Sequence, residues 1–169
     1  FMSLGGWAIT QQCFDWIVAN VPLGSKVLEF GSGDGTGELA KHFEMTSIEE
    51  SDKWLNIHPS KYIHAPIENG WYSLKAIEDA NLDEDYAMIL VDGPTKRLRA
   101  GMKPYVLSNL SLFENCLVVF DDTNRESDRA VCEWFIEQGF VKVAEMMDER
   151  VIDKPSPKQF TVLEKNTNY

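Results

Sequence analysis

Four glycines stand within seven residues, directly after a short apolar segment. Residues 27–30 predict a buried strand, a helix is expected over 34–43, and the glycines around this junction are Gly31, Gly33, Gly35 and Gly37. Glycine lets the backbone turn with positive φ and lets a ligand approach without a Cβ in the way, at an entropic cost that a plain turn does not require. Glu29 is expected to point into the same crevice, which is the layout of a nucleoside-binding switch point.

A dinucleotide site is the first alternative for this turn. The pattern G-x-G-x-x-G/A fails from the first glycine, because its third position falls on Thr36, and the match from Gly35 starts inside the expected helix. A pyrophosphate favours a helix N-terminus without negative charge, whereas Glu29, Asp34 and Glu38 crowd this one. Carboxylates instead suit a ligand that carries positive charge and hydroxyl groups.

The run E-F-G-S-G-D-G-T-G, residues 29–37, resembles the first motif of class I S-adenosylmethionine-dependent methyltransferases. In that family the sulfonium and the amino group of the cofactor lie over this loop. The resemblance therefore implies S-adenosylmethionine as the cofactor. The residues implied to bind it here are Glu29, Phe30, Gly31, Ser32, Gly33 and Gly35, together with Asp92.

An acidic residue follows the second expected strand, 18 residues after Gly31. Glu49 stands where such a carboxylate accepts both hydroxyls of a ribose. Glu50 is the rival, and strand alternation points the two to opposite sides; we favour Glu49 because it directly follows the apolar run. A solvated strand end is the bland alternative. In the resembling family the loop that holds Pro66 and Ile67 packs against the adenine ring.

Three more carboxylates end two buried strands. Asp92 follows the apolar run 86–91, and Asp121 and Asp122 follow the run 116–120. Burying three carboxylates together is costly unless a proton or a cation neutralises them. Mg²⁺ is one such cation, since it takes oxygen ligands. The arrangement resembles metal-dependent O-methyltransferases, which implies Asp92, Asp121 and Asp122 as metal ligands. Asp122 stands where that family carries Asn, and capping of the next helix is the alternative role.

A basic cluster follows Asp92 in an otherwise acidic chain. It comprises Lys96, Arg97, Arg99 and Lys103. Cations near a helix N-terminus oppose its dipole, so the cluster is expected to receive an acceptor that bears carboxylate or phosphate. Lys96 is also a candidate general base. The alternative is a solvated basic face that pairs with the chain's own surplus of acids.

The composition indicates one globular domain, residues 1–169, with 44% hydrophobic residues. The net charge of −11 argues against nucleic acid and against an anionic membrane surface as partners. Cys13, Cys116 and Cys132 have neither metal nor disulfide spacing, so reduced thiols and a cytoplasmic location are expected. The oligomeric state is not indicated.

Helical and strand-like periods alternate along the chain, which is typical of α/β proteins. Helices are expected over 6–20, 34–43, 71–80, 103–113 and around 131–138, and strands over 27–30, 45–49, 61–64, 86–91, 116–120, 140–147 and 159–164. The last two strands have no helix between them and predict an antiparallel hairpin. The resemblance implies a three-layer Rossmann-like methyltransferase fold, with a mostly parallel seven-stranded sheet.

These observations predict transfer of a methyl group from S-adenosylmethionine to a hydroxyl oxygen of a small, anionic acceptor molecule. Asp92, Lys96 and Asp121 are the expected catalytic residues, and Mg²⁺ is an optional cofactor. Two alternatives stay open at this point. One is a non-catalytic cofactor-binding or regulatory domain on the same fold, and the other is a nicotinamide-dependent oxidoreductase.

Overall fold

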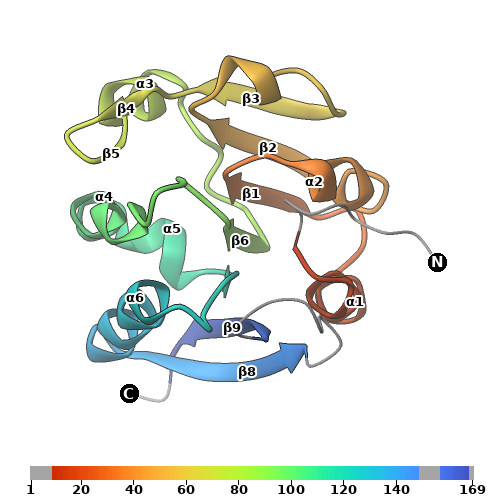
Figure 1. Cartoon of the computed structure of the whole chain (residues 1–169), viewed down its shortest axis with the longest axis vertical. Coiled ribbons are helices and arrows are strands. Elements are labelled where there is room, and N and C mark those ends of the chain that lie inside the picture. Colours follow the sequence, from red (N-terminus) through yellow and green to blue (C-terminus); the bar gives the residue numbers. More distant parts are fainter. Residues whose placement is uncertain (1–8, 149–156, 168–169) are drawn as a thin grey trace.

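A computed structural model describes residues 9–148 and 157–167. In this part of the chain seven strands form one sheet (Figure 1) in the order β3-β2-β1-β6-β7-β9-β8. The strands are β1 (Lys26–Phe30), β2 (Glu44–Glu49), β3 (Ser60–His64), β6 (Met88–Val91), β7 (Leu117–Phe120), β8 (Phe140–Asp148) and β9 (Lys158–Lys165). The first five in this spatial order are parallel, and β9 and β8 pair antiparallel. The predicted fold class and the C-terminal antiparallel pair are confirmed.

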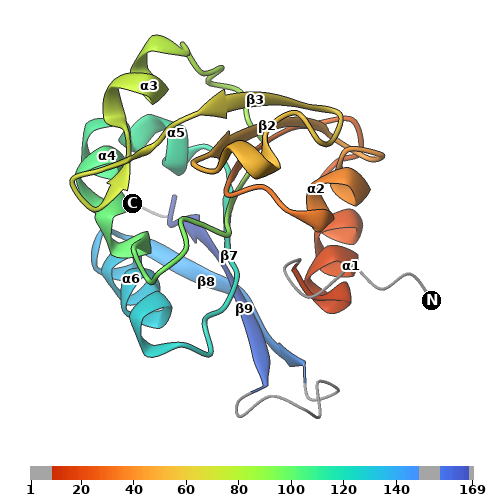
Figure 2. The same cartoon turned by 45° about the horizontal axis from the view of Figure 1, so that its top comes forward.

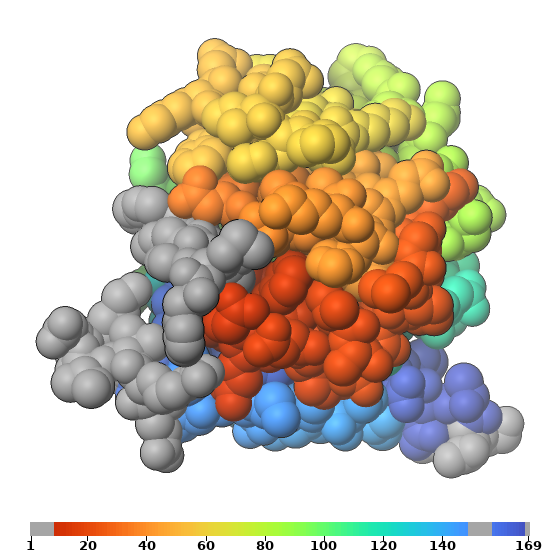
Figure 3. All heavy atoms as spheres, turned by 90° about the vertical axis from the view of Figure 1, so that its right-hand side faces the viewer, coloured from red at the N-terminus to blue at the C-terminus, as the bar shows by residue number. Residues whose placement is uncertain are grey.

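Helices cover both faces of the sheet, which gives three layers (Figures 1 and 2). On one face lie α1 (Gln11–Asn20) and α2 (Asp34–Leu39). Figure 3 looks onto this side, where the red atoms of α1 lie between orange atoms, which include α2, and the blue atoms of β8. On the other face lie α3 (Leu74–Asp79), α4 (Lys103–Ser108), α5 (Leu110–Glu114) and α6 (Glu126–Glu137), with the short η2 (Arg99–Met102) between β6 and α4. A second 3-10 turn, η1 (Asp52–Trp54), follows β2.

Alternating side chains of the central strands fill two cores. In β6, Met88 and Leu90 belong to the core under α1 and α2, whereas Ile89 and Val91 belong to the core under α3 to α6. Successive strand residues point to opposite faces, so a strand covered on both faces must be apolar throughout. This is why the continuous apolar runs of the sequence located β6 and β7 well.

Three predicted helices differ from the structure. The helix expected over 34–43 ends at Leu39. After it the N–H groups of Lys41 and His42 donate to the carbonyls three residues before them instead of four, and β2 begins at Glu44. The helix expected over 71–80 begins only at Leu74. The helix expected over 103–113 is two helices, broken at Asn109, whose side chain donates to the Tyr105 carbonyl.

Residues 71–72 form a strand instead of the predicted helical turn. They are β5 (Trp71–Tyr72), which pairs antiparallel with β4 (Ile67–Glu68). Asn69 and Gly70 connect them with φ of +53° and +84°, as a two-residue hairpin turn requires. The predicted helix over 6–20 is observed from Gln11, with Thr10 as its N-cap; positions 6–8 lie outside the described residues.

No helix among residues 9–148 and 157–167 is long and apolar enough to cross a membrane.

Candidate functional site

The glycine-rich turn lies at the carboxyl end of β1, against the end of β6. Gly31 has φ +92°, and a Cβ placed on it would stand 2.9 Å from the Asp92 carbonyl oxygen. The backbone of the turn therefore packs on Asp92 at a distance that only glycine allows. The side chain of Phe30 points away from the crevice, because its ring is buried against Trp71 and Tyr105. Its carbonyl accepts the N–H of Asp92 at 2.9 Å.

Glu29 lies under the turn rather than in an open crevice. Its side chain is 2% exposed, and one oxygen, Oε1, accepts the hydroxyls of Thr36 and Ser47, each at 2.6 Å. Burial raises the pKa of Glu29 from 4.5 to about 7, although the two hydroxyls act in the opposite direction. Glu29 thus lines the cavity beside the turn, and its carboxyl also ties α2 to β2.

A small cavity separates the turn from the end of β6. It measures about 10 Å³, the room for one water. Its lining includes Glu29, Gly33, Gly35, Thr36 and Asp92. Two of the predicted cofactor-binding glycines thus face Asp92 across a polar gap.

Glu49 ends β2 and is joined to the glycine-rich turn. Its Oε1 accepts the backbone N–H of Ser32 at 2.9 Å, and its Oε2 accepts the N–H of Ser51 at 2.7 Å. The residue is 5% exposed, so the carboxylate is held in one orientation. Glu50 lies at the rim, where Thr95 donates to it at 3.1 Å. The structure therefore brings Glu49, and not Glu50, onto the turn.

The loop expected to contact adenine lies beyond β3. Pro66 is exposed and its carbonyl accepts the N–H of Ser73, while Ile67 is half-buried in the short hairpin of β4 and β5. Trp71 and Tyr72, from the same hairpin, are buried against Phe30. The hairpin thus anchors this loop in the core, with Pro66 on its outer side.

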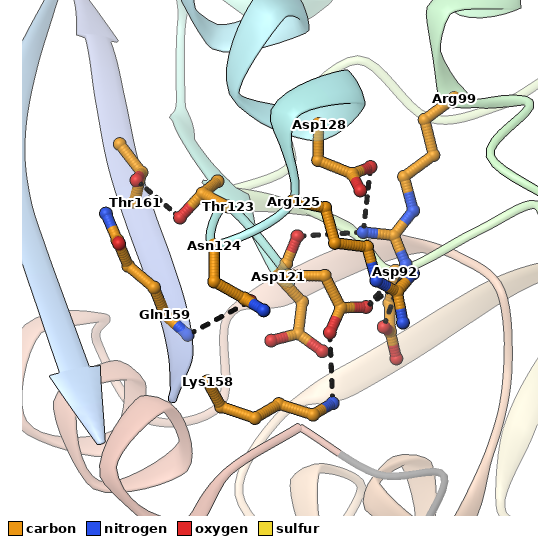
Figure 4. Close-up of polar contacts among 11 residues, drawn as sticks. Asp92, Arg99, Asp121, Thr123, Asn124, Arg125, Asp128, Lys158, Gln159 and Thr161 are labelled. Atoms are coloured by element: carbon orange, nitrogen blue, oxygen red, sulfur yellow. Dashed lines mark hydrogen bonds and ion pairs between the residues drawn. The ribbon is translucent and has the colours of Figure 1, made fainter. Parts of the chain in front are cut away.

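The carboxylates at the strand ends converge on one arginine (Figure 4). Arg99 Nη2 lies 3.0 Å from Asp122 Oδ2 and 3.5 Å from Asp92 Oδ1, and Nη1 lies 3.3 Å from Asp128 Oδ1. Nη1 also donates to the Asp121 carbonyl at 2.8 Å. The arginine side chain is 7% exposed. We call Asp92, Asp121, Asp122 and Asp128 the acid cluster.

A lysine from β9 reaches the same cluster. Lys158 Nζ lies 3.0 Å from Asp122 Oδ1, and Arg125 Nη1 lies 3.5 Å from Asp122 Oδ2. Asp122 has φ +60°, so the chain turns directly after β7 and the Asp122 side chain meets both β9 and η2. One carboxylate is thus contacted by three cationic side chains.

The acid cluster divides into two kinds of carboxyl group. Burial, and then the charge of Asp121, raises the pKa of Asp92 well above its usual range. Burial, and then the charge of Asp122, raises the pKa of Asp121. Burial acts upward on Asp122 as well, but Arg99 and Lys158 outweigh it and lower the pKa of Asp122. Asp122 is therefore the carboxylate that the cations satisfy, and Asp121 Oδ1 is buried without a hydrogen-bond partner.

The residues do not fit the Mg²⁺ site that the resemblance implies. Oxygens of Asp92, Asp121 and Asp122 do lie within 4.8 Å of one another. However, both oxygens of Asp122 are already engaged, and an Arg99 nitrogen lies between Asp92 and Asp122. A divalent ion there would stand beside two fixed positive charges.

The predicted basic cluster separates into three parts. Arg99 points inward, so the expectation that it receives an acceptor is wrong: its charge pairs with the acid cluster. Lys103 lies over the ring of Trp134, 5.7 Å from its centroid. Lys96 and Arg97 are exposed beside the end of β6, both with φ +60°. They are the members of the cluster that face solvent at the mouth of the sheet.

Three charged contributors to the site were not predicted from the sequence: Arg125, which directly precedes α6, and Lys158 and Asp128. Lys158 and Asp128 come from β9 and α6, 36 and six residues after Asp122. The register of β7 with β9, in which Phe120 pairs with Thr161, places Lys158 opposite the residues that follow β7. No local pattern around Lys158 signals this contact, because it depends on antiparallel pairing between distant segments.

Comparison with solved structures decides the fold. The M1A22 tRNA methyltransferase TrmK of B. subtilis is 13% identical, with 95% of this chain and 68% of that chain aligned and a TM-score of 0.60. An rRNA methylase of Streptococcus thermophilus is 16% identical, with 91% and 94% aligned and a TM-score of 0.60. This chain has the class I methyltransferase fold. No protein-family model matches the sequence, and neither does any curated protein.

A third similar structure contains ligands. It is the 1,6-didemethyltoxoflavin-N1-methyltransferase of Burkholderia thailandensis, with bound 1,6-didemethyltoxoflavin and S-adenosylhomocysteine. It is 11% identical, with 92% of this chain and 77% of that chain aligned and a TM-score of 0.63. The similar structures therefore include proteins named as methyltransferases of tRNA, of rRNA and of 1,6-didemethyltoxoflavin.

The exclusion of nucleic acid as a partner is wrong. It rested on the net charge of −11, yet two of the similar structures are named as a tRNA methyltransferase and an rRNA methylase. Net charge is a sum over the whole chain, whereas phosphate contacts depend on the local field at the binding surface. An acidic total therefore does not exclude a nucleic-acid acceptor for this fold.

Proposed function

We propose that this chain is an S-adenosylmethionine-dependent methyltransferase. The observation that carries the proposal is the junction of β1, β2 and β6, where Glu49 is fixed on the backbone of the glycine-rich turn and Asp92 faces that turn. This junction lies at the carboxyl ends of parallel strands, where ligands bind in open α/β sheets. S-adenosylmethionine, when bound, supplies an electrophilic methyl group.

The chain's residues divide the binding task by their chemistry. The two Glu49 oxygens each keep a lone pair beyond the backbone N–H that they accept, which suits the two hydroxyls of a ribose. Gly31 lets the turn pack directly on the Asp92 backbone, and Gly33 lines the small gap beside Asp92. Asp92 is 18% exposed as a side chain and offers a carboxyl group to the amino group of the methionine part.

We further propose that the acceptor is an anionic small molecule, methylated on a hydroxyl oxygen. Lys96 and Arg97 are exposed directly after Asp92, where they can receive an anion. Asp92 or Lys96 would take the hydroxyl proton. Burial, and then the charge of Asp121, raises the pKa of Asp92 and makes its carboxylate a stronger base, so Asp121 helps Asp92 in this role. Catalysis would otherwise consist of positioning the acceptor for in-line attack.

The cofactor proposal is tested by calorimetry with S-adenosylmethionine and S-adenosylhomocysteine. The change is Glu49→Gln, with Glu50→Gln as the matched control one residue away. We expect the first variant to bind on the order of 1–3 kcal/mol more weakly, the cost of poorly paired hydroxyls, and the control to bind like the native chain. Equal affinities in all three proteins, or binding of NAD(H) instead, would remove the proposal.

The acceptor proposal is tested by methyl transfer to a library of hydroxyl compounds, with tRNA and rRNA assayed in parallel. We expect transfer to an anionic small molecule and a higher KM with kcat kept in Arg97→Gln. Lys96→Gln should also raise KM, and its kcat falls if Lys96 is the base. Cofactor affinity should be kept in both variants. Lys103→Gln serves as the control, since its charge lies over Trp134. Transfer to RNA alone would replace the acceptor proposal, and cofactor binding without transfer to anything would favour a regulatory domain.

A further inference from the structure

The acid cluster contains a cation of its own at the point where a metal would bridge. A single nitrogen of Arg99, Nη2, contacts both Asp92 and Asp122, at 3.5 and 3.0 Å. The guanidinium group thus already links Asp92 Oδ1 and Asp122 Oδ2, so these two oxygens are not free to share a metal ion. Figure 4 shows Arg99 entering from the η2 side and directing its nitrogens toward the aspartates.

A second cation closes the cluster from the opposite side. Lys158 reaches from β9 to the other oxygen of Asp122, at 3.0 Å, and its side chain is 15% exposed. Burial acts to lower the pKa of Lys158, but Asp121 and Asp122 outweigh it and raise that pKa. Both cations therefore stay charged at neutral pH.

Arg99 is also held from three directions, so an incoming ion would not displace it easily. Its Nη1 contacts Asp128 of α6 at 3.3 Å and the carbonyl of Asp121, the residue after β7, at 2.8 Å. Burial acts to lower the pKa of Arg99, but Asp92, Asp128 and Asp122 outweigh it and raise that pKa. Releasing Arg99 would leave these groups buried without their partner.

We infer that Arg99 and Lys158 take the place of a divalent cation in the acid cluster, so that the site works without Mg²⁺. Arg99 is a positioning residue in this view: it fixes Asp92 at the end of β6 while it connects η2, β7 and α6. Methyl transfer without a metal ion rests on the proposed function. Metal binding is a property of the folded chain alone and is measured separately.

The test titrates Mn²⁺, which stands in for Mg²⁺ and whose free form is counted by electron paramagnetic resonance. The change is Lys158→Gln, which removes the more exposed of the two cations and leaves Arg99 in place. The control is Lys165→Gln, which removes the same charge from the same strand, where Lys165 lies 3.4 Å from Glu114. Circular dichroism checks that each variant is folded.

We expect the native chain and the control to bind Mn²⁺ equally weakly. Lys158→Gln should bind at least about tenfold more tightly, a change of about 1.4 kcal/mol, and Asp121→Asn added to it should abolish the gain. Methyl transfer by the native chain should be unchanged in excess chelator.

Two results would overturn the inference. One is tight Mn²⁺ binding by the native chain that Asp121→Asn removes. The other is a folded Lys158→Gln variant that binds no better than Lys165→Gln. The native titration decides the matter even where Lys158→Gln does not fold, and neither metal readout depends on finding an acceptor.

Discussion

Glu29 makes the stability of this chain depend on pH in a predictable direction. Burial raises its pKa from 4.5 to about 7 in the folded protein, while the unfolded chain ionises this group near the ordinary value. Between these pH values the folded state holds a proton that the unfolded state has released. The stability linked to this proton is therefore fully present below pH 4.5 and is lost as the pH rises to about 7.

The magnitude follows from the same values. A pKa rise from 4.5 to about 7 corresponds to about 3 kcal/mol of unfolding free energy. The perturbation is Glu29→Gln, which keeps the size of the side chain and an acceptor oxygen for Thr36 and Ser47 but does not ionise. We expect the variant to gain about 3 kcal/mol relative to the native chain between pH 4.5 and pH 8.

The assay is urea unfolding followed by tryptophan fluorescence at each pH. The native chain also contains Asp92 and Asp121, whose raised pKa values act in the same direction. The quantity to compare is therefore the difference between the native chain and the variant. The control is Glu133→Gln, an exposed change on α6. Its unfolding free energy should differ from that of the native chain by the same amount at every pH. A pH profile that is the same for Glu29→Gln and the native chain would refute the reasoning.

Two further predictions concern backbone fit and buried charge. Gly31→Ala and Gly24→Ala both place a side chain at positive φ, but only the former meets a backbone atom, at 2.9 Å, whereas nothing lies within 4 Å at Gly24. Both should lose roughly 1 kcal/mol or more to strain, and Gly31→Ala should lose clearly more in urea unfolding; equal losses would contradict the close approach of Asp92. Arg99→Gln should lose about 3–5 kcal/mol, because it leaves buried carboxylates without their cation, while the exposed Arg97→Gln should stay within about 0.5 kcal/mol. Comparable melting of these two arginine variants would show that Arg99 is not the centre of the cluster.

The sequence predicted best what depends on neighbouring residues. The buried strands β6 and β7 follow from continuous apolar runs, and Asp92, Asp121 and Asp122 follow from where those runs end. Because β6 and β7 are parallel neighbours, these carboxyl groups lie together at the carboxyl ends of the two strands, as expected. The strand order itself came from the resemblance to methyltransferases, because the period of each element does not specify which strands are neighbours.

The sequence contains a local signal for the short hairpin of β4 and β5, although a helix was predicted over 71–80. Asn69-Gly70 is the pair that a two-residue hairpin turn favours, and both residues have positive φ. The predicted helix over 71–80 includes the two aromatic residues that follow this turn. In the structure Trp71 and Tyr72 pair with the strand before the turn and pack on Phe30.

The direction of a charged side chain was the part that the sequence could not supply. Arg99 and Arg97 differ by two positions in one basic run, yet Arg99 is buried among carboxylates and Arg97 is exposed. The difference arises because η2 carries Arg99 over the ends of β6 and β7, and because α6 brings Asp128 to it. Asp121, Asp122 and Asp128 all lie more than 20 residues after Arg99, so the pattern of the basic run alone does not distinguish the two arginines.

This division of charges changes what the net charge means for an acceptor. Arg99 and Lys158 neutralise the chain's own carboxylates and offer little to a ligand outside, whereas Lys96 and Arg97 remain exposed beside the crevice. An anionic acceptor, whether a small molecule or RNA, would meet these two cations against an acidic background. Attraction that depends on so few charges is local and sensitive to salt.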